Sequence, residues 1–136
     1  MAIEIGGIDH VVLRVRDLAA SLEFYSGVLG CREERRLDAL GLVQLRAGNA
    51  LIDLVPVDSP LGREGGKAPG EGGRNVDHIA FQVPEFDATR LRAHLESHGV
   101  EPGEVASRYG AQGMGPSIYI RDPDGNVVEL IEFEQG

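Results

Sequence analysis

Two Asp-His pairs and two isolated carboxylates are the side chains in this sequence most suited to chemistry. His10 and His78 each follow an aspartate, in stretches that alternate as half-buried strands do. Asp53 and Glu129 each lie alone in an otherwise apolar run. An ionised carboxylate on a buried face is costly unless it is paired or bound to a metal. Because this cost occurs twice, at equivalent places in two similar halves, we infer that the two carboxylates share a purpose.

Two imidazoles and two carboxylates would together form a metal site with two nitrogen and two oxygen ligands. Alternation along the strands puts each carboxylate on the same face of its sheet as the histidine of its own half. This ligand set suits Zn, Fe, Mn, Ni or Co, and the ligand types do not choose among these metals. His10, Asp53, His78 and Glu129 are therefore candidate metal ligands. For Asp53, a capped carboxylate or one at a sheet edge is the alternative explanation.

The two histidines begin two copies of one structural unit. Residues 8–15 and 76–83 match in register, aspartate on aspartate and histidine on histidine. A predicted helix follows each copy, with Asp17 and Asp87 as its N-caps and with Gly30 and Gly99 at its end. The same order of elements in both halves predicts an internal duplication.

Each half of the chain reads as a strand, a helix and three further strands. Beyond the helices, we predict strands over 32–40, 42–46 and 50–55 in the first half, and over 100–109, 117–121 and 126–133 in the second. The predicted fold class is α+β. Two tandem βαβββ modules, 7–56 and 76–134, form a half-open barrel-like mixed sheet with helices outside, in a single domain spanning 1–136.

Residues 57–75 differ in kind from both modules. They contain six glycines and two prolines, a composition that predicts no packed element. We therefore expect a mobile linker between the modules. A flexible flap over the site is the functional alternative.

Composition restricts the partners and the compartment of this chain. A net charge of −9 argues against nucleic acid and against an anionic membrane surface as partners. The single cysteine, Cys31, excludes an internal disulfide framework and fits a reducing compartment. The first seven residues lack the features of a signal peptide, and no apolar run approaches a membrane span. We expect a cytoplasmic protein.

A tight turn places one further side chain beside the predicted ligands. The sequence Asp-Pro-Asp-Gly at 122–125 can form a hairpin loop with Gly125 in the left-handed region. The resulting register puts Tyr119 directly opposite Glu129, on the same face. Tyr119 is therefore a candidate catalytic residue, whose phenol would hydrogen-bond the substrate or orient the carboxylate. The alternative is an aromatic wall of the site.

Four phrases of the sequence carry a family resemblance that spans nearly the whole chain: Ile-Asp-His at 8–10, Ser-Leu-Glu-Phe-Tyr-Ser-Gly-Val-Leu-Gly at 21–30, Asp-His-Ile-Ala at 77–80, and Asp-Pro-Asp-Gly-Asn-Val-Val-Glu-Leu at 122–130. They resemble the vicinal oxygen chelate superfamily, which includes glyoxalases, bleomycin-resistance proteins and extradiol dioxygenases. The likeness is greatest to small single-domain glyoxalase-like proteins. It implies paired βαβββ modules and one divalent metal ion per site, with His10, His78 and Glu129 as ligands and Asp53 at a more variable fourth position.

The resemblance also implies a class of chemistry. A small substrate would chelate the metal through two adjacent oxygens, and Glu129 or Asp53 would serve as the base that moves a proton at the neighbouring carbon. We expect a glyoxalase-like lyase or isomerase. An extradiol-type dioxygenase and a non-catalytic small-molecule binding protein of the antibiotic-resistance type are the alternatives. Since each half-barrel has an open edge and an apolar strip, and relatives pair their modules, we expect a homodimer. Neither the metal nor the substrate is identified by the sequence.

Overall fold

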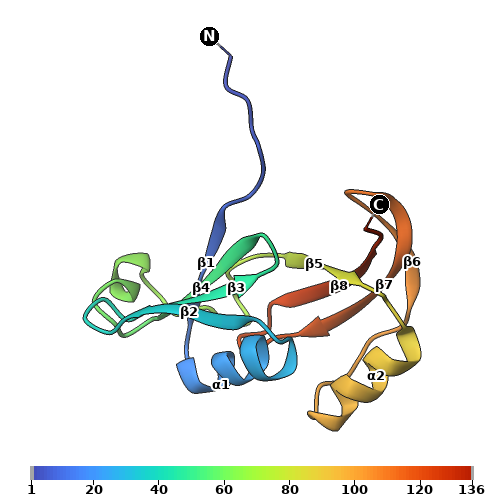
Figure 1. Cartoon of the computed structure of the whole chain (residues 1–136). Helices are drawn as coiled ribbons and strands as arrows, with labels where there is room; N and C mark the ends of the chain where they lie inside the picture. The colour runs from blue at the N-terminus through green and yellow to red at the C-terminus, as the bar shows by residue number, and fades with distance from the viewer. Residues whose placement is uncertain (1, 136) are drawn as a thin grey trace. The chain divides into compact units, whose positions relative to one another are not determined.

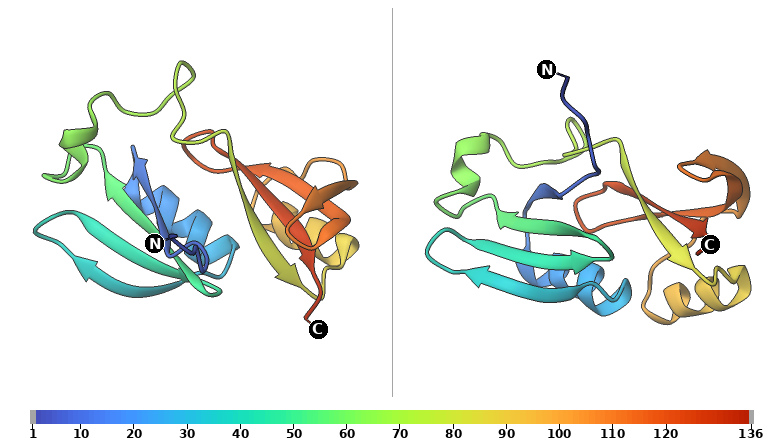
Figure 2. Two further views of the ribbon diagram at one scale, coloured as in Figure 1. Left: turned by 90° about the horizontal axis from the view of Figure 1, so that it is seen from above. Right: turned by 45° about the horizontal axis from the view of Figure 1, so that its top comes forward.

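The computed structural model describes residues 2–135, which form two compact units that meet in sequence between Ala68 and Pro69. In each unit a four-stranded sheet carries a helix on one face (Figures 1 and 2). This arrangement confirms the predicted α+β fold of two βαβββ modules. The sheets are mixed, and neither closes into a barrel within the described residues.

The first unit contains the predicted order of elements. Its sheet has the strand order β1-β4-β3-β2, in which β1 runs parallel to β4 and the other neighbours are antiparallel. A short π-helix, Glu23–Val28, directly continues α1. The bounds are β1 His10–Val15, α1 Leu18–Leu22, β2 Arg32–Leu37, β3 Leu42–Ala47 and β4 Ala50–Pro56.

The second unit repeats this topology. Its strand order is β5-β8-β7-β6, again with one parallel pair, β5 with β8. β7 is longer than we predicted, because it begins at Gly113 and forms a hairpin with β6. The bounds are β5 His78–Pro84, α2 Ala88–Ser97, β6 Ala106–Gly110, β7 Gly113–Arg121 and β8 Val127–Phe133.

The duplication holds at the level of single residue pairs. Asp53 lies opposite Val12, two residues beyond His10, and Glu129 lies opposite Ala80, two residues beyond His78. Directly paired residues share a face of the sheet, and faces alternate along a strand. Each carboxylate therefore lies on the histidine face of its own sheet, as the alternation predicted.

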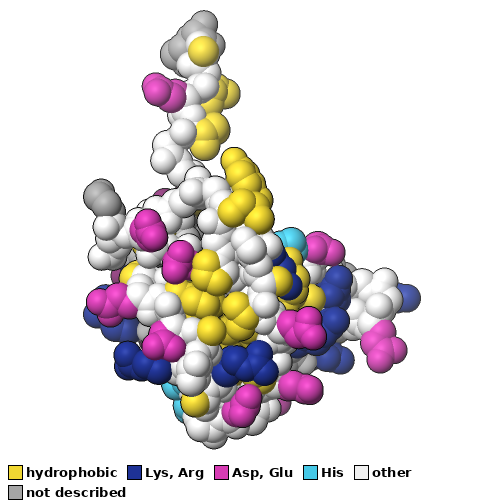
Figure 3. Space-filling view, turned by 90° about the vertical axis from the view of Figure 1, so that its right-hand side faces the viewer, with side chains coloured by type: hydrophobic (Ala, Val, Ile, Leu, Met, Phe, Trp, Pro, Cys, Tyr) yellow, Lys and Arg dark blue, Asp and Glu magenta, His cyan; other side chains and the backbone are white. Residues whose placement is uncertain are grey.

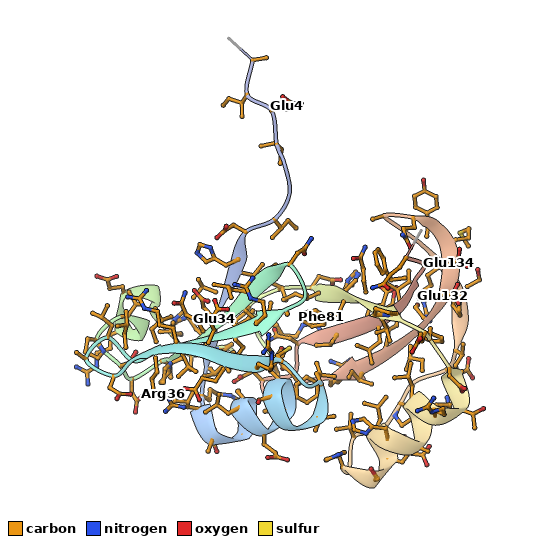
Figure 4. The ribbon with its side chains drawn as sticks, in the orientation of Figure 1. Glu4, Glu34, Arg36, Phe81, Glu132 and Glu134 are labelled. Atoms are coloured by element: carbon orange, nitrogen blue, oxygen red, sulfur yellow. The ribbon has the colours of Figure 1, made fainter. Side chains whose placement is uncertain are left out.

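The opposite face of each sheet supplies the hydrophobic core. On β1, Leu13 and Val15 are buried while Val12 is exposed. On β5, Phe81 (labelled in Figure 4) is half-buried while His78 is exposed. The core also includes apolar residues from the helical segments and the inner strands: Phe24, Tyr25, Val28, Val43, Leu45, Ile52, Leu54, Leu95, Ile118, Ile120, Val128 and Leu130.

Both predicted N-caps are present. The Asp17 carboxylate accepts a hydrogen bond from the Ala20 amide, and the Asp87 carboxylate accepts one from the Arg90 amide, each at 3.1 Å. Gly30 adopts the left-handed conformation that favours glycine at a helix end, with φ of 79°. These local signals fixed the helix positions, although the π-helical continuation was not predicted.

Part of the 57–75 segment is packed, so our expectation of no packed element there is wrong over 57–68. A 3-10 helix spans Gly62–Gly65. The Arg14 guanidinium on β1 donates hydrogen bonds to the carbonyls of Gly62, Gly66 and Lys67 at 3.0, 2.7 and 2.9 Å. A side chain at Gly65 would collide with this guanidinium. The absence of a side chain at Gly65 lets the Arg14 guanidinium approach the backbone closely. The segment has little apolar packing, and the hydrogen bonds of this one arginine hold it against β1 instead.

The turn at 122–125 forms as predicted. One oxygen of the buried Asp122 carboxylate accepts hydrogen bonds from the amides of Asp124 and Asn126, and the other accepts one from the Asn126 side chain, all at 2.9 Å. Gly125 has a φ of 84°. The turn therefore fixes the register of β7 against β8, with Tyr119 opposite Glu129.

Candidate metal centre

The two Asp-His pairs have the same geometry in both units. Nδ1 of His10 lies 2.6 Å from a carboxylate oxygen of Asp9, and Nδ1 of His78 lies 2.6 Å from one of Asp77. A carboxylate can only accept, so Nδ1 carries the hydrogen in both pairs. Nε2 of each ring is left as the nitrogen that can bind a metal ion.

The charges around His10 favour its protonated form. The hydrogen bond from Nδ1 to Asp9 and the negative charge of Asp53 raise the pKa of His10 above its usual value. In the second unit, the hydrogen bond with His78 lowers the pKa of Asp77. A raised histidine pKa stabilises the fold below the unfolded-state pKa, and this contribution disappears as the pH rises through the folded-state pKa.

Replacement of Asp9 by asparagine is expected to lower the pKa of His10. The amide can still accept the hydrogen bond, but it lacks the negative charge that favours the imidazolium. An NMR titration of the His10 ring in metal-free protein measures the change. Asp38→Asn, in the exposed turn after β2, removes the same charge elsewhere in this unit and should leave the His10 pKa unchanged. Equal pKa values in wild type and Asp9→Asn would contradict the pairing.

Asp53 is buried and already has a hydrogen-bond donor. The side-chain amide nitrogen of Gln44 lies 3.2 Å from each Asp53 oxygen, and Gln44 is the direct cross-strand neighbour of Asp53. Gln44 thus occupies the position in the first unit that Tyr119 occupies in the second. Our sequence reasoning missed Gln44. For Tyr119 we derived the register of a hairpin from its turn. The same step for the predicted turn at Gly48 and Asn49 would have placed Gln44 opposite Asp53.

Glu129 lies beside His78, as predicted. Its side chain is only 7 % exposed, and its Oε1 lies 3.5 Å from Nε2 of His78. The ring of Tyr119 stands edge-on to the His78 ring with centroids 5.9 Å apart, which puts the tyrosine on the histidine face. The predicted placement of Tyr119 is therefore confirmed, and its catalytic role stays a prediction.

The structure brings the candidate ligands together as two pairs. His10 shares a face with Asp53 in the first unit, and His78 shares one with Glu129 in the second. Among residues 2–135, no three histidine, cysteine, aspartate or glutamate side chains are grouped closely enough to hold a metal ion. The four-ligand site therefore stays a prediction.

The chemistry of each pair fits a divalent metal ion. In each unit, one imidazole whose Nε2 is not used by the aspartate lies on the same face as one carboxylate, and that carboxylate is almost buried. Within the described part of the chain, the Glu129 carboxylate has His78 as its one ionic partner. A buried anion with so little compensation is the kind of group that a metal ion stabilises.

Charged groups are dispersed on the one face of the molecule that Figure 3 shows. On the face shown in Figure 3, acidic side chains are interspersed with lysine, arginine and hydrophobic groups. Glu34 on β2, labelled in Figure 4, accepts two hydrogen bonds from the Arg46 guanidinium at 3.0 and 2.8 Å. Across residues 2–135, no helix has the length and apolar character needed to cross a membrane.

Known proteins share both the sequence pattern and the fold. The chain is 29 % identical over 132 residues to virulence protein STM3117 of Salmonella typhimurium, covering 93 % of this chain and 83 % of that protein. It is 31 % identical over 148 residues to a lactoylglutathione lyase of Pseudomonas aeruginosa, covering 91 % and 81 %. The structure of an integron cassette protein from Vibrio cholerae matches with a TM-score of 0.78 and 28 % identity, covering 98 % of this chain and all of that one.

A family model gives the same result over almost the whole chain. Residues 7–130 match the model described as the Glyoxalase/Bleomycin resistance protein/Dioxygenase superfamily. The matched region contains both Asp-His pairs, both buried carboxylates and the turn at 122–125. The family that the sequence phrases resembled is thereby confirmed, and this chain belongs to the glyoxalase/bleomycin resistance protein/dioxygenase superfamily.

Proposed function

We propose that this protein is a divalent-metal-dependent lyase or isomerase of the vicinal oxygen chelate type. Its substrate is a small molecule that presents two adjacent oxygens. The observation that carries the proposal is a geometry that occurs in both units. A histidine that is hydrogen-bonded to the preceding aspartate shares a face of the sheet with a buried carboxylate on the neighbouring parallel strand. This carboxylate lies opposite the residue two positions after the histidine. The lactoylglutathione lyase named above supports the choice of reaction class.

His10, His78 and Glu129 hold the ion in this proposal, with Asp53 as a fourth ligand. A bound divalent ion supplies positive charge that stabilises an oxyanion on the substrate. Glu129 takes the proton from the carbon beside the oxyanion and returns it to the neighbouring atom, so that no net proton is consumed. Asp53 is the weaker candidate for this role, because both of its oxygens already face the Gln44 amide.

The proposed reaction is tested by supplying proton-transfer substrates to metal-loaded protein. Hemithioacetals of methylglyoxal with glutathione and with other small thiols are incubated in D₂O, and product formation and deuterium uptake are followed by NMR. We expect turnover with at least one thiol and none after the metal is removed with a chelator. Turnover of a catechol with consumption of O₂ would instead support the dioxygenase alternative. Tight binding of a test compound without turnover would support a binding protein.

We also propose that the protein is a homodimer. β1 and β5 form edges of their sheets, and within residues 2–135 neither pairs on its outer side with another strand. Unpaired edges bind other strands readily. Large apolar side chains are also exposed, including Ile3, Ile5, Tyr109 and Met114. Light scattering at micromolar concentration is expected to give twice the chain mass, and a monomer would contradict the proposal.

A further inference from the structure

An arginine that no sequence pattern singled out lies on the histidine face of the second unit. Arg108 is on β6, and its guanidinium carbon lies 4.0 Å from the centre of the Tyr119 ring. Tyr119 is in turn edge-on to His78 and directly opposite Glu129. A cation is therefore held beside the pair of side chains that we propose as ligands.

The position of Arg108 is fixed by three contacts. Its Nη1 donates hydrogen bonds to the Ser117 carbonyl at 2.9 Å and to the Ser117 hydroxyl at 2.8 Å, and Ser117 is fully buried. The Tyr119 ring forms the third contact, a cation–π interaction. Holding a long side chain in one place in this way costs conformational entropy and removes water from the charge.

The charge of Arg108 is not balanced by a carboxylate. Among residues 2–135 it forms no ion pair, although this half-buried cation belongs to a chain of net charge −9. The Ser117 bonds use Nη1, so the edge formed by Nε and Nη2 keeps its donors. That edge has the planar geometry that binds carboxylate, phosphonate or phosphate oxygens through two parallel hydrogen bonds.

We propose that Arg108 binds an anionic group of the substrate, a carboxylate, phosphonate or phosphate, beside the Tyr119 ring. This inference rests on the proposed function, because it makes Arg108 part of the same site. It narrows the substrate class to small molecules that carry a negative group in addition to two adjacent chelating oxygens. Arg108 then determines specificity, while Glu129 moves the proton.

The first experiment uses metal-free protein, so it does not depend on metal binding. Inorganic phosphate is titrated into ¹⁵N-labelled protein, and the Nε–H signal of Arg108 is followed by NMR. We expect a saturable shift, and the affinity for phosphate should fall at least about tenfold in Arg108→Gln, because a charge-assisted pair of hydrogen bonds is lost. Arg90→Gln, which removes the same charge from an exposed position on α2, should bind phosphate as wild type does. An Arg108 signal that does not respond to phosphate would overturn the proposal.

The second experiment uses two chelators that differ by one anionic group. Acetohydroxamate presents two adjacent oxygens, and phosphonoacetohydroxamate adds a phosphonate to the same chelating unit. Metal-loaded wild-type protein is expected to prefer the phosphonate by at least about tenfold, and Arg108→Gln should lose this preference while its affinity for acetohydroxamate stays unchanged. Arg108→Lys, which keeps the charge but lacks the planar fork, should show a smaller preference than wild type. Melting temperatures verify that the variants fold.

The outcomes separate this inference from the proposed function. If the protein binds no metal, the proposed function fails, and the phosphate titration still tests the anion site. If metal and acetohydroxamate bind but wild type shows no preference for the phosphonate, or Arg108→Gln keeps the preference, Arg108 serves only to pack on Tyr119. The anion site is then overturned while the metal site stands.

Discussion

Replacement of His78 by alanine is expected to leave the purified protein without its metal ion. The variant lacks the imidazole whose Nε2 lies 3.5 Å from the Glu129 carboxylate. Loss of a partner that only orients a ligand costs about 10–100-fold in metal affinity, and loss of a ligand should cost more. Elemental analysis of protein purified without added ions measures the effect. His98→Ala, at the exposed end of α2, is the control and should keep its metal.

Wild type should contain about one divalent ion per chain. Equal metal content in wild type and in His78→Ala would contradict the metal centre. The two carboxylates give an internal comparison. Glu129→Gln should lose more metal than Asp53→Asn, because Gln44 already donates to both Asp53 oxygens. A greater loss in Asp53→Asn would reverse our ranking of these ligands.

Replacement of Tyr119 by phenylalanine is expected to lower kcat/KM at least about tenfold, or roughly 1.4 kcal/mol in transition-state stabilisation. In our proposal the phenol hydrogen-bonds a substrate oxygen or orients Glu129, which is its direct cross-strand neighbour. Phenylalanine keeps the aromatic ring that Arg108 covers, so the anion contact should survive. Steady-state rates on the substrate found in the thiol series measure the change.

Two controls make the Tyr119 result specific. The metal content of Tyr119→Phe should equal that of wild type, since the phenol is not a proposed ligand. Tyr109→Phe removes the same hydroxyl from an exposed position on β6, where the side chain is 81 % exposed, and should leave the rate unchanged. If Tyr119→Phe turns over at the wild-type rate, Tyr119 is only a wall of the site.

The sequence alone determined the order of the elements in both halves and the register of one hairpin. The matched Asp-His stretches at 8–15 and 76–83 revealed the duplication, because strand alternation and N-caps are local properties of the chain. Turn chemistry at 122–125 even fixed the register that sets Tyr119 against Glu129. A two-residue periodicity also assigned His10 and Asp53 to one face, since paired residues in adjacent strands share a face.

The tertiary structure decided the contacts between side chains that are distant in sequence. Gln44 donates a hydrogen bond to Asp53, and Arg14 donates hydrogen bonds to the segment after β4. The Arg108 guanidinium stacks on the Tyr119 ring. The composition of 57–68 predicted no packing, because apolar content cannot reveal that one guanidinium will bind three carbonyls. Long polar side chains have many rotamers, and their partners are chosen only once strands from separate parts of the chain lie together. The periodicity of the sequence therefore identified the candidate ligands. The side chains that contact these ligands and their neighbours could be identified only in the folded units.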